Sequence, residues 1–545
     1  MRLENKIGIH FAILVFSFFT SSALAQYRPV ELMKRIHLVP QPESVVYKEK
    51  KIAFPKEVSV IGLSHHAPEH QRTLESLTNL FETFSDVSFD IDGYHPYKIH
   101  FIRKDNLPDE GYELVSTENG VTIYASTASG EFYGAQTLYQ LLAFSYWGSN
   151  MLDISYKPLE EDAFEKKYIP LLSIQDEPQL ELRSFMIDMG RATFPLPYIK
   201  RIIRIMAHLK MNMLHIRLFD DELNGFRFQT LPLGQENPYA IDADDLKEIV
   251  RYARSYHITV MPEMESWGHV GSIVYHYPDL FGAVGMYGGS SFAIGEPTYQ
   301  LLEKMYEEVL LCLEDDAVIH VGLDEATWAV LPGEEDNGHT PTTLVGDIYD
   351  ILMRLGEKHN KEITMHLWAD HGGRPLPERI TGEVVIEPWE YTEAGSQRIT
   401  DRLEKYGGEN KTALMMGGGV RSTCYDGDYG ATRIWCQQGV YYPNVLGITI
   451  CLWGANDLAG RLISLYGGAD YAWTPQTPEL KIGDDTGESL RSDINVRMRK
   501  WQTLFPDAGD NILNVDRGPE TFMGRYLWPP MSNKAVAPTV DFKPE

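Results

Sequence analysis

The sequence predicts an α/β protein in which a (β/α)8 TIM barrel follows a smaller α+β accessory domain. Three observations support this prediction. The chain has 545 residues, which is too long for one small core. Between residues 26 and 175 apolar residues alternate as they do in paired strands. From residue 176 to 545 apolar, strand-like runs alternate with amphipathic stretches, which is typical of repeated βα units followed by a carboxy-terminal extension.

Residues 1–25 have the pattern of a secretory signal peptide. Arg2 and Lys6 supply positive charge, residues 7–19 are apolar, and residues 23–25 (A-L-A) form a small-x-small cleavage site. The apolar run is short for a membrane span, and a buried amino-terminal helix is the alternative interpretation. We therefore expect an exported protein, periplasmic or secreted, with no transmembrane segment.

Bulk composition narrows the choice of partners. A formal net charge of −28 argues against nucleic acid or an anionic membrane as a partner, and carries no information about a neutral sugar. Cysteines are too few for a disulfide scaffold and have no C-x-x-C metal spacing. They are Cys312, Cys424, Cys436 and Cys451. Cys424 and Cys436 could pair across a loop, although unpaired thiols are the simpler interpretation. We predict no metal and no cofactor, and the oligomeric state stays open.

The accessory domain shows strands and helices but no catalytic group of residues. The expected strands cover residues 58–62, 111–116 and 120–125, and the expected helices cover residues 69–84 and 130–142.

Eight apolar strand candidates follow in the second part of the chain. They are Leu182–Met189, Met211–Phe219, Thr259–Met264, Val318–Leu323, Ile363–Trp368, Val384–Pro388, Ala413–Met416 and Gly447–Trp453. Amphipathic segments lie between most of them, for example at 197–209, 243–256, 298–313 and 343–359. Eight such units closing on themselves give a (β/α)8 barrel.

Charged and aromatic residues follow nearly every expected strand. The run at 318–323 ends in the adjacent carboxylates Asp324 and Glu325. Because side chains alternate along a strand, both carboxylates can serve one pocket only where the strand ends and the backbone turns. The other strand ends carry Asp188, Arg191, Asp220, Asp221, Glu263, Glu265, His269, Trp368, Asp370, Trp389, Glu390, Tyr425 and Trp453, with Gly417–Gly419 expected to open the seventh loop. In a parallel barrel these ends meet at one mouth.

Such a mouth suits a sugar. Tryptophan faces stack on pyranose rings, and carboxylates and Arg hydrogen-bond hydroxyl groups. Cleavage of a glycosidic bond needs a carboxylic acid for the leaving oxygen and a group that stabilises charge at the anomeric carbon. A metal-dependent barrel hydrolase would have an H-x-H pair where this chain has His215-Ile216-Arg217. The sequence also lacks a P-loop, a G-x-G-x-x-G loop and a G-x-S-x-G elbow.

Several motifs resemble those of one known family. Residues 320–325 (H-V-G-L-D-E) resemble the H-x-G-x-D-E signature of glycoside hydrolase family 20, the β-N-acetylhexosaminidases. Residues 188–191 and 210–215 are similar to its first two barrel strands, and residues 262–269 to its P-E-[IF]-D-x-P-G-H segment. Residues 111–142 resemble the end of its accessory domain. The matches come in the family's order and span most of the mature chain.

The resemblance implies a retaining, substrate-assisted mechanism in which the substrate's 2-acetamido oxygen is the nucleophile. Glu325 would be the general acid and then the general base, and Asp324 would orient the acetamide. Asp220 and His269 would form a relay behind Glu325. Arg191 would bind the 3- and 4-hydroxyls and Tyr425 the acetamide oxygen. The remaining substrate-binding candidates are Trp368, Asp370, Trp389, Trp453 and Asn456.

Four positions depart from the family pattern. Glu265 stands where the family has Asp, Trp267 where it has Pro, and Arg217 where a His is common. Ala455 stands where an acid usually contacts the outer hydroxyls. This last change leaves open a preference for a 6-substituted sugar, for example a sulfated one. Its cationic contacts would come from Arg217, His366, His371 or Arg374.

The leading hypothesis is an exo-acting β-N-acetylhexosaminidase that releases terminal β-linked GlcNAc or GalNAc from oligosaccharides or glycoconjugates. The alternative from another class is a non-catalytic glycan-binding protein on the same scaffold, because fold does not guarantee function. A second alternative is a retaining glycosidase with a protein carboxylate as nucleophile.

Overall fold

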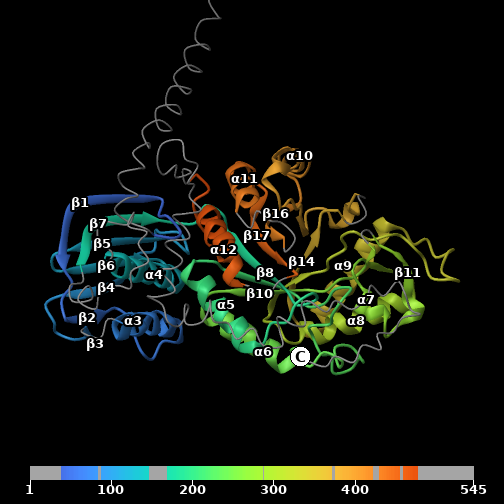
Figure 1. The fold of residues 1–545 in the computed structure, drawn as a ribbon, viewed down its shortest axis with the longest axis horizontal. Helices are drawn as coiled ribbons and strands as arrows, with labels where there is room; N and C mark the ends of the chain where they lie inside the picture. Colours follow the sequence, from blue (N-terminus) through green and yellow to red (C-terminus); the bar gives the residue numbers. More distant parts are fainter. Residues whose placement is uncertain are drawn as a thin grey trace, which may run out of the picture.

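The computed structural model describes residues 38–83, 87–145, 168–285, 288–370, 375–421, 429–454 and 458–476 (Figure 1). The predicted signal peptide therefore lies outside the described residues. So do Cys424, Tyr425, Ala455, Asn456 and the cationic candidates His371 and Arg374. Within the described part, the helices are too short or too polar to cross a membrane.

The first domain is built on a mixed seven-stranded sheet with strand order β1-β7-β5-β6-β4-β2-β3. One half is antiparallel: β1 (Ser44–Ala53), β7 (Tyr168–Asp176), β5 (Tyr112–Thr117) and β6 (Gly120–Ala125). The other half runs parallel: β4 (Lys98–Arg103), β2 (Glu57–Ile61) and β3 (Ser88–Ile91). Two helices, α3 (Gln71–Thr83, after the short η1 at Pro68–His70) and α4 (Ala128–Ser145), pack together beside the sheet (Figure 1). The five predicted elements are present as β2, α3, β5, β6 and α4.

The second domain is a closed parallel barrel, as predicted. Its strands follow the order β10-β13-β14-β15-β16-β17-β8-β9, and every neighbouring pair is parallel. They are β8 (Leu182–Asp188), β9 (Met213–Arg217), β10 (Thr259–Glu263), β13 (Asp316–His320), β14 (Glu362–Trp368), β15 (Val384–Glu387), β16 (Ala413–Arg421) and β17 (Val445–Trp453). All eight predicted strands are therefore confirmed.

Amphipathic helices surround the barrel (Figure 1). The long ones are α5 (Leu196–His208), α6 (Ala243–Ser255), α8 (Glu296–Leu310), α9 (Pro341–His359), α10 (Ser396–Tyr406), α11 (Gly430–Gly439) and α12 (Leu458–Trp473). The apolar spacing of α5 shows why they form: Ile199, Ile202, Ile203 and Met206 are all buried on one face. Side-chain caps define the starts of α6, at Asp242, and α9, at Thr340.

Shorter elements lie between the barrel units. After β10 the chain forms α7 (Gly271–Val274), η3 (Pro278–Leu280) and the small hairpin of β11 (Phe281–Val284) and β12 (Ser290–Phe292). Two further single turns, η6 (Glu378–Ile380) and η7 (Glu393–Gly395), precede β15 and α10.

Most predicted strand ends lie within two residues of the observed ones, and two carboxyl ends differ by more. The fourth barrel strand, β13, ends at His320 rather than at Leu323, because Gly322 and Leu323 have φ angles of +68° and +80°. The seventh, β16, continues to Arg421, so Gly417–Gly419 pair with β17 instead of opening a loop. A Cβ atom at Gly419 would lie 2.3 Å from the backbone of Cys451, and this close strand contact explains the glycine.

A buried ion pair joins the two domains. Lys210, just before β9, places Nζ 2.8 Å from Asp176 Oδ2 at the end of β7. Tyr112 of β5 also bonds to both groups, and Trp473 at the end of α12 donates Nε1–H to Asp176 Oδ1 at 2.7 Å. Because these residues are buried, the accessory sheet packs directly on the amino-terminal face of the barrel.

Candidate active site

A sharp turn after β13 presents the two adjacent carboxylates. Glu325 has a φ of +51°, which few non-glycine residues adopt. Its backbone N–H donates to Asp370 Oδ2 at 3.3 Å, so the end of β14 supports the turn. The Asp324 side chain is 10% exposed and that of Glu325 is 15% exposed. Both carboxylates therefore reach one partly enclosed site, as the sequence predicted for a strand that ends in a turn.

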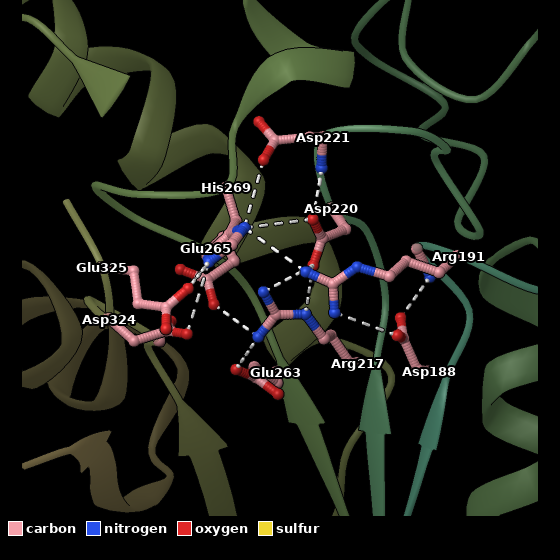
Figure 2. A network of polar contacts seen from close by, with 12 residues as sticks. Asp188, Arg191, Arg217, Asp220, Asp221, Glu263, Glu265, His269, Asp324 and Glu325 are labelled. Carbon is pink, nitrogen blue, oxygen red and sulfur yellow. Dashed lines mark hydrogen bonds and ion pairs between the residues drawn. The ribbon is translucent and has the colours of Figure 1, made fainter. Parts of the chain in front are cut away.

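His269 connects these carboxylates with the end of β9 (Figure 2). Its Nε2 lies 3.5 Å from Asp324 Oδ2 and 3.3 Å from Glu325 Oε2. Its Nδ1 lies 3.3 Å from Asp220 Oδ1 and 3.1 Å from Asp221 Oδ2. The imidazole is thus placed between two pairs of carboxylates, which is the geometry of a proton relay.

The charges around this relay favour a protonated imidazole. Burial opposes the charged form of His269, but Asp220 and Asp324 outweigh it and raise its pKa well above the usual range. Burial likewise opposes ionisation of Asp220, but the Arg191 and Arg217 guanidiniums hold its pKa well below the usual range. An ionised Asp220 therefore faces a protonated His269.

Arg191 lies at the mouth of the site with its side chain 22% exposed. Its guanidinium is 2.8 Å from Asp220, 3.3 Å from Asp188 and 3.5 Å from Glu222. Burial of Glu222 and the nearby Asp220 raise the pKa of Glu222 to about 8, against the opposing effect of Arg191. This corner therefore offers a fixed cation beside a carboxyl that is protonated near neutral pH.

Aromatic rings form a wall of the site. The Trp368 and Trp453 ring centroids are 5.7 Å apart, and Trp389 stacks on Tyr391 at 5.3 Å. Trp389 donates Nε1–H to Asp370 Oδ1 at 3.0 Å. Burial, and then the charge of Asp324, raise the pKa of Asp370 to about 6. Asp370 thus accepts hydrogen bonds both from the Trp389 ring and from the backbone of the turn that carries Asp324 and Glu325.

The floor of the site is a buried guanidinium. Arg217, the last residue of β9, forms ion pairs of 2.6 Å with Asp220, Glu263 and Glu265. Its Cζ atom also lies 4.9 Å from the centre of the Trp453 ring. The prediction of Arg217 as a contact for a substrate anion is therefore wrong, because its side chain is fully buried and already neutralised.

His366 is not accessible either. It is buried in the barrel, with Nδ1 2.7 Å from Glu387 Oε1.

Buried histidines and acids raise the question of a metal. His215, Glu263 and His320 bring ligand atoms within 4.8 Å of one another, and parts of the relay do the same. However, Glu263 Oε1 already accepts hydrogen bonds from Trp368 Nε1 and Arg217, and its Oε2 lies 2.9 Å from His215. Oε1 of this carboxylate is thus hydrogen-bonded, whereas its Oε2 and both ring nitrogens of His215 have no hydrogen-bond partner among the described residues, and the absence of a metal stays a prediction.

Comparison with known sequences supports this geometry. Residues 181–394 match the sequence model of "Glycosyl hydrolase family 20, catalytic domain". Residues 35–177 match that of "Glycosyl hydrolase family 20, domain 2". The chain belongs to glycosyl hydrolase family 20. The resemblance noted in the sequence is therefore confirmed for both domains.

Named members of family 20 are distant relatives. A beta-hexosaminidase of Porphyromonas gingivalis is 28% identical over 277 residues, which cover 48% of this chain and 34% of the relative. One of Vibrio furnissii is 26% identical over 333 residues, 53% of this chain and 50% of the relative. The chain thus matches at most half the length of these two relatives.

Solved family 20 structures share the fold. The N-acetyl-beta-hexosaminidase of Streptomyces plicatus, in complex with Thio-NAglucal, has a TM-score of 0.64 at 23% identity. That alignment covers 89% of this chain and 97% of the other. The beta-N-acetylhexosaminidase of Bacteroides fragilis has a TM-score of 0.62 at 19% identity, covering 87% and 96%.

Within this family 20 site, the structure brings most predicted residues together. Those that meet at the mouth are Asp220, His269, Asp324, Glu325, Arg191, Trp368, Asp370, Trp389 and Trp453. Their individual roles remain predictions, as do those of Tyr425 and Asn456. The sequence analysis did not assign a role to Asp221, Glu222 or Tyr391. Their positions in the sequence could have indicated them, because Asp221 and Glu222 follow Asp220, and Tyr391 follows Glu390.

The cysteines show no pairing in the described part of the chain. Cys312, Cys436 and Cys451 are free and buried there.

Proposed function

We propose that this chain is an exo-acting β-N-acetylhexosaminidase that removes terminal, non-reducing β-linked GlcNAc or GalNAc from glycans. The observation that carries the proposal is Asp324 Oδ1. This buried oxygen has no hydrogen-bond partner among the described residues, although it lies beside Glu325 and His269. A buried acceptor without a partner is costly unless a ligand completes it. The acetamide N–H of a bound N-acetylhexosamine is a suitable donor.

The proposed reaction is retaining and substrate-assisted. Glu325 gives its proton to the glycosidic oxygen while the bond from that oxygen to the anomeric carbon breaks. The 2-acetamido oxygen attacks the same carbon and forms an oxazolinium ion, whose positive charge Asp324 stabilises. Glu325 then takes a proton from water, which opens the ring and gives a product of retained configuration. His269, 3.3 Å from Glu325, is placed to adjust the protonation of that carboxyl in both steps.

The position of Asp324 disfavours the mechanism with a protein nucleophile. Asp324 and Glu325 both contact the same nitrogen, Nε2 of His269. In that alternative the nucleophile sits about 5 Å from the acid and on the opposite face of the sugar. Asp324 is instead the chain neighbour of the acid, and its unpaired Oδ1 suits the acetamide N–H of the substrate.

A non-catalytic glycan-binding protein would need fewer of these residues. It would need the aromatic wall and Arg191 to bind a sugar, but it would not need a proton relay. The contacts of His269 with Asp220, Asp324 and Glu325 therefore favour the enzyme.

A preference for a 6-substituted sugar is a narrower proposal. Of its four cationic candidates, Arg217 and His366 are buried and paired, and His371 and Arg374 lie outside the described residues. Arg191 is the partly exposed cation of the described site, and Asp188 and Glu222 flank it.

The test compares aryl β-N-acetylglucosaminide with aryl β-glucoside, and adds N-acetylglucosamine-thiazoline as inhibitor. We expect cleavage of the acetamido sugar alone, blocked by the thiazoline. The GalNAc and 6-sulfated analogues then define the preferred terminal sugar. Glycan binding without cleavage of any of these substrates would establish the binding-protein alternative.

We also propose that the protein is exported, on the pattern of its first 25 residues. Amino-terminal sequencing of the mature protein should then begin at Gln26.

A further inference from the structure

Glu265 lies directly beneath the turn that carries Asp324 and Glu325. Its Oε2 accepts a hydrogen bond from the Leu323 N–H at 3.3 Å. A Cβ atom on Gly322 would lie 2.2 Å from the same oxygen, so the turn packs against this carboxylate as closely as glycine allows. Leu323 and Glu325 have positive φ angles, and such strained backbone persists only where its surroundings fix it. Glu265 is therefore one of the contacts that determine the shape of the turn.

Arg217 holds Glu265 from the other side. Its Nη1 lies 2.6 Å from Glu265 Oε1 (Figure 2). Oε2 of the same carboxylate accepts the hydrogen bond from Leu323. Both side chains are fully buried. Burial, and then Asp324 and Glu263, raise the pKa of Glu265, and Arg217 is the strongest opposing influence. Without Arg217, Glu265 would lose the charge that favours its ionised form.

The same guanidinium also reaches the rest of the site. It contacts Asp220, which faces His269, and it lies against the ring of Trp453. Its partner Glu263 accepts the Trp368 Nε1–H at 2.7 Å. The buried guanidinium of Arg217 thus contacts, directly or through one carboxylate, the Asp220–His269 relay, the rings of Trp368 and Trp453, and the turn that carries Asp324 and Glu325.

We propose that Arg217 and Glu265 are a pair of positioning residues, linked in series beneath the turn, whose contact sets the height of the turn and so the reach of Glu325. The proposal rests on the proposed function. Replacing Glu by Asp alone removes one methylene, about 1.5 Å of chain. Glu265 would then lose either Leu323 or Arg217, and an error of about 1 Å can lower a rate about 100-fold.

A double-mutant cycle tests the pair. The variants are Arg217→Lys, which keeps a cation beside Asp220 and Glu263, Glu265→Asp and the double variant, assayed on an aryl β-N-acetylhexosaminide. We expect each single change to lower kcat about 10- to 100-fold with little change in KM, since the turn moves but the aromatic wall remains. The double variant should be about as slow as the slower single variant, because both changes break the same chain of contacts. Losses that multiply in the double variant would overturn the proposal.

Stability provides the control, because a pair that only holds the fold would also show coupling. Melting temperatures of all four proteins are measured in parallel. Coupling in the melting temperature without coupling in kcat would assign the pair a structural role and refute positioning. A wild type without hydrolase activity would instead refute the proposed function. The same cycle is then measured as the Kd of N-acetylglucosamine-thiazoline, where additive losses would refute the pair.

Discussion

The two ends of β9 carry two buried ion-pair networks with different consequences. Before the strand, Lys210 pairs with Asp176. Asp176 Oδ2 accepts hydrogen bonds from Lys210 and Tyr112, and Oδ1 accepts one from Trp473, all buried residues. After the strand, Arg217 contacts three carboxylates, and nearby Asp324 keeps a buried oxygen with no partner in the described part of the chain. The carboxylate of the first network is fully hydrogen-bonded within the protein. Beside the second network, Asp324 Oδ1 is a hydrogen-bond acceptor that has no donor among the described residues.

The buried ion pair at the amino-terminal end of β9 stabilises the fold, whereas the one at its carboxyl end lies in the candidate active site. In parallel barrels the amino-terminal ends of the strands serve stability and the carboxyl ends carry catalysis. Here the accessory sheet, through Asp176 and Tyr112, closes the amino-terminal end. Substitutions in the two networks should therefore change different observables.

The largest effect is expected for Glu325→Gln. Loss of the general acid should lower kcat by about 10²- to 10⁴-fold on sugars with poor leaving groups. Activated aryl glycosides should lose less, because their leaving oxygen needs little protonation. The melting temperature should stay close to that of wild type, since the Glu325 side chain is partly exposed and its partner His269 is also held by Asp220 and Asp221. Equal losses on both kinds of substrate would count against the acid role.

For Lys210→Met we expect a lower free energy of unfolding and no change in rate. Removing one partner of a buried ion pair typically costs about 3–5 kcal/mol. Denaturant unfolding should show this loss, and kcat of the folded protein should stay unchanged. The matched control is Lys210→Met with Asp176→Leu, which leaves no unpaired charge and should recover much of the stability. A fall in kcat at unchanged stability would remove the distinction between the two networks.

Much of this arrangement could be predicted from the sequence, because it depends on local patterns. The alternation of apolar runs and helices predicted all eight barrel strands, and the residues after each strand predicted the members of the site. Asp324 and Glu325 were identifiable because they directly follow an apolar run.

Pairing across strands could not be predicted in the same way. Arg217 was expected to face the substrate, yet it is buried, since its neighbours in the barrel register are Asp188 and Glu263. The sequence does not reveal that register. The end of β13 was placed at Leu323 for a similar reason, because the positive φ of this apolar residue is supported by Glu265 from the loop after β10. The Lys210–Asp176 contact joins two domains and has no local signature.

The last prediction concerns how the stability contributed by Glu222, at the carboxyl end of β9, depends on pH. Burial raises the pKa of Glu222 to about 8, so the folded protein keeps this proton where the unfolded chain, with a pKa near 4.5, has lost it. The stability contributed by Glu222 is therefore complete below pH 4.5 and is lost as the pH rises to about 8. Thermal unfolding should show wild type becoming progressively less stable than Glu222→Gln across this range. Exposed Glu314 provides the matched substitution, Glu314→Gln, which should show no such trend. No pH-dependent difference between wild type and Glu222→Gln would mean that Glu222 is as well solvated as a surface carboxylate and holds no proton near neutral pH.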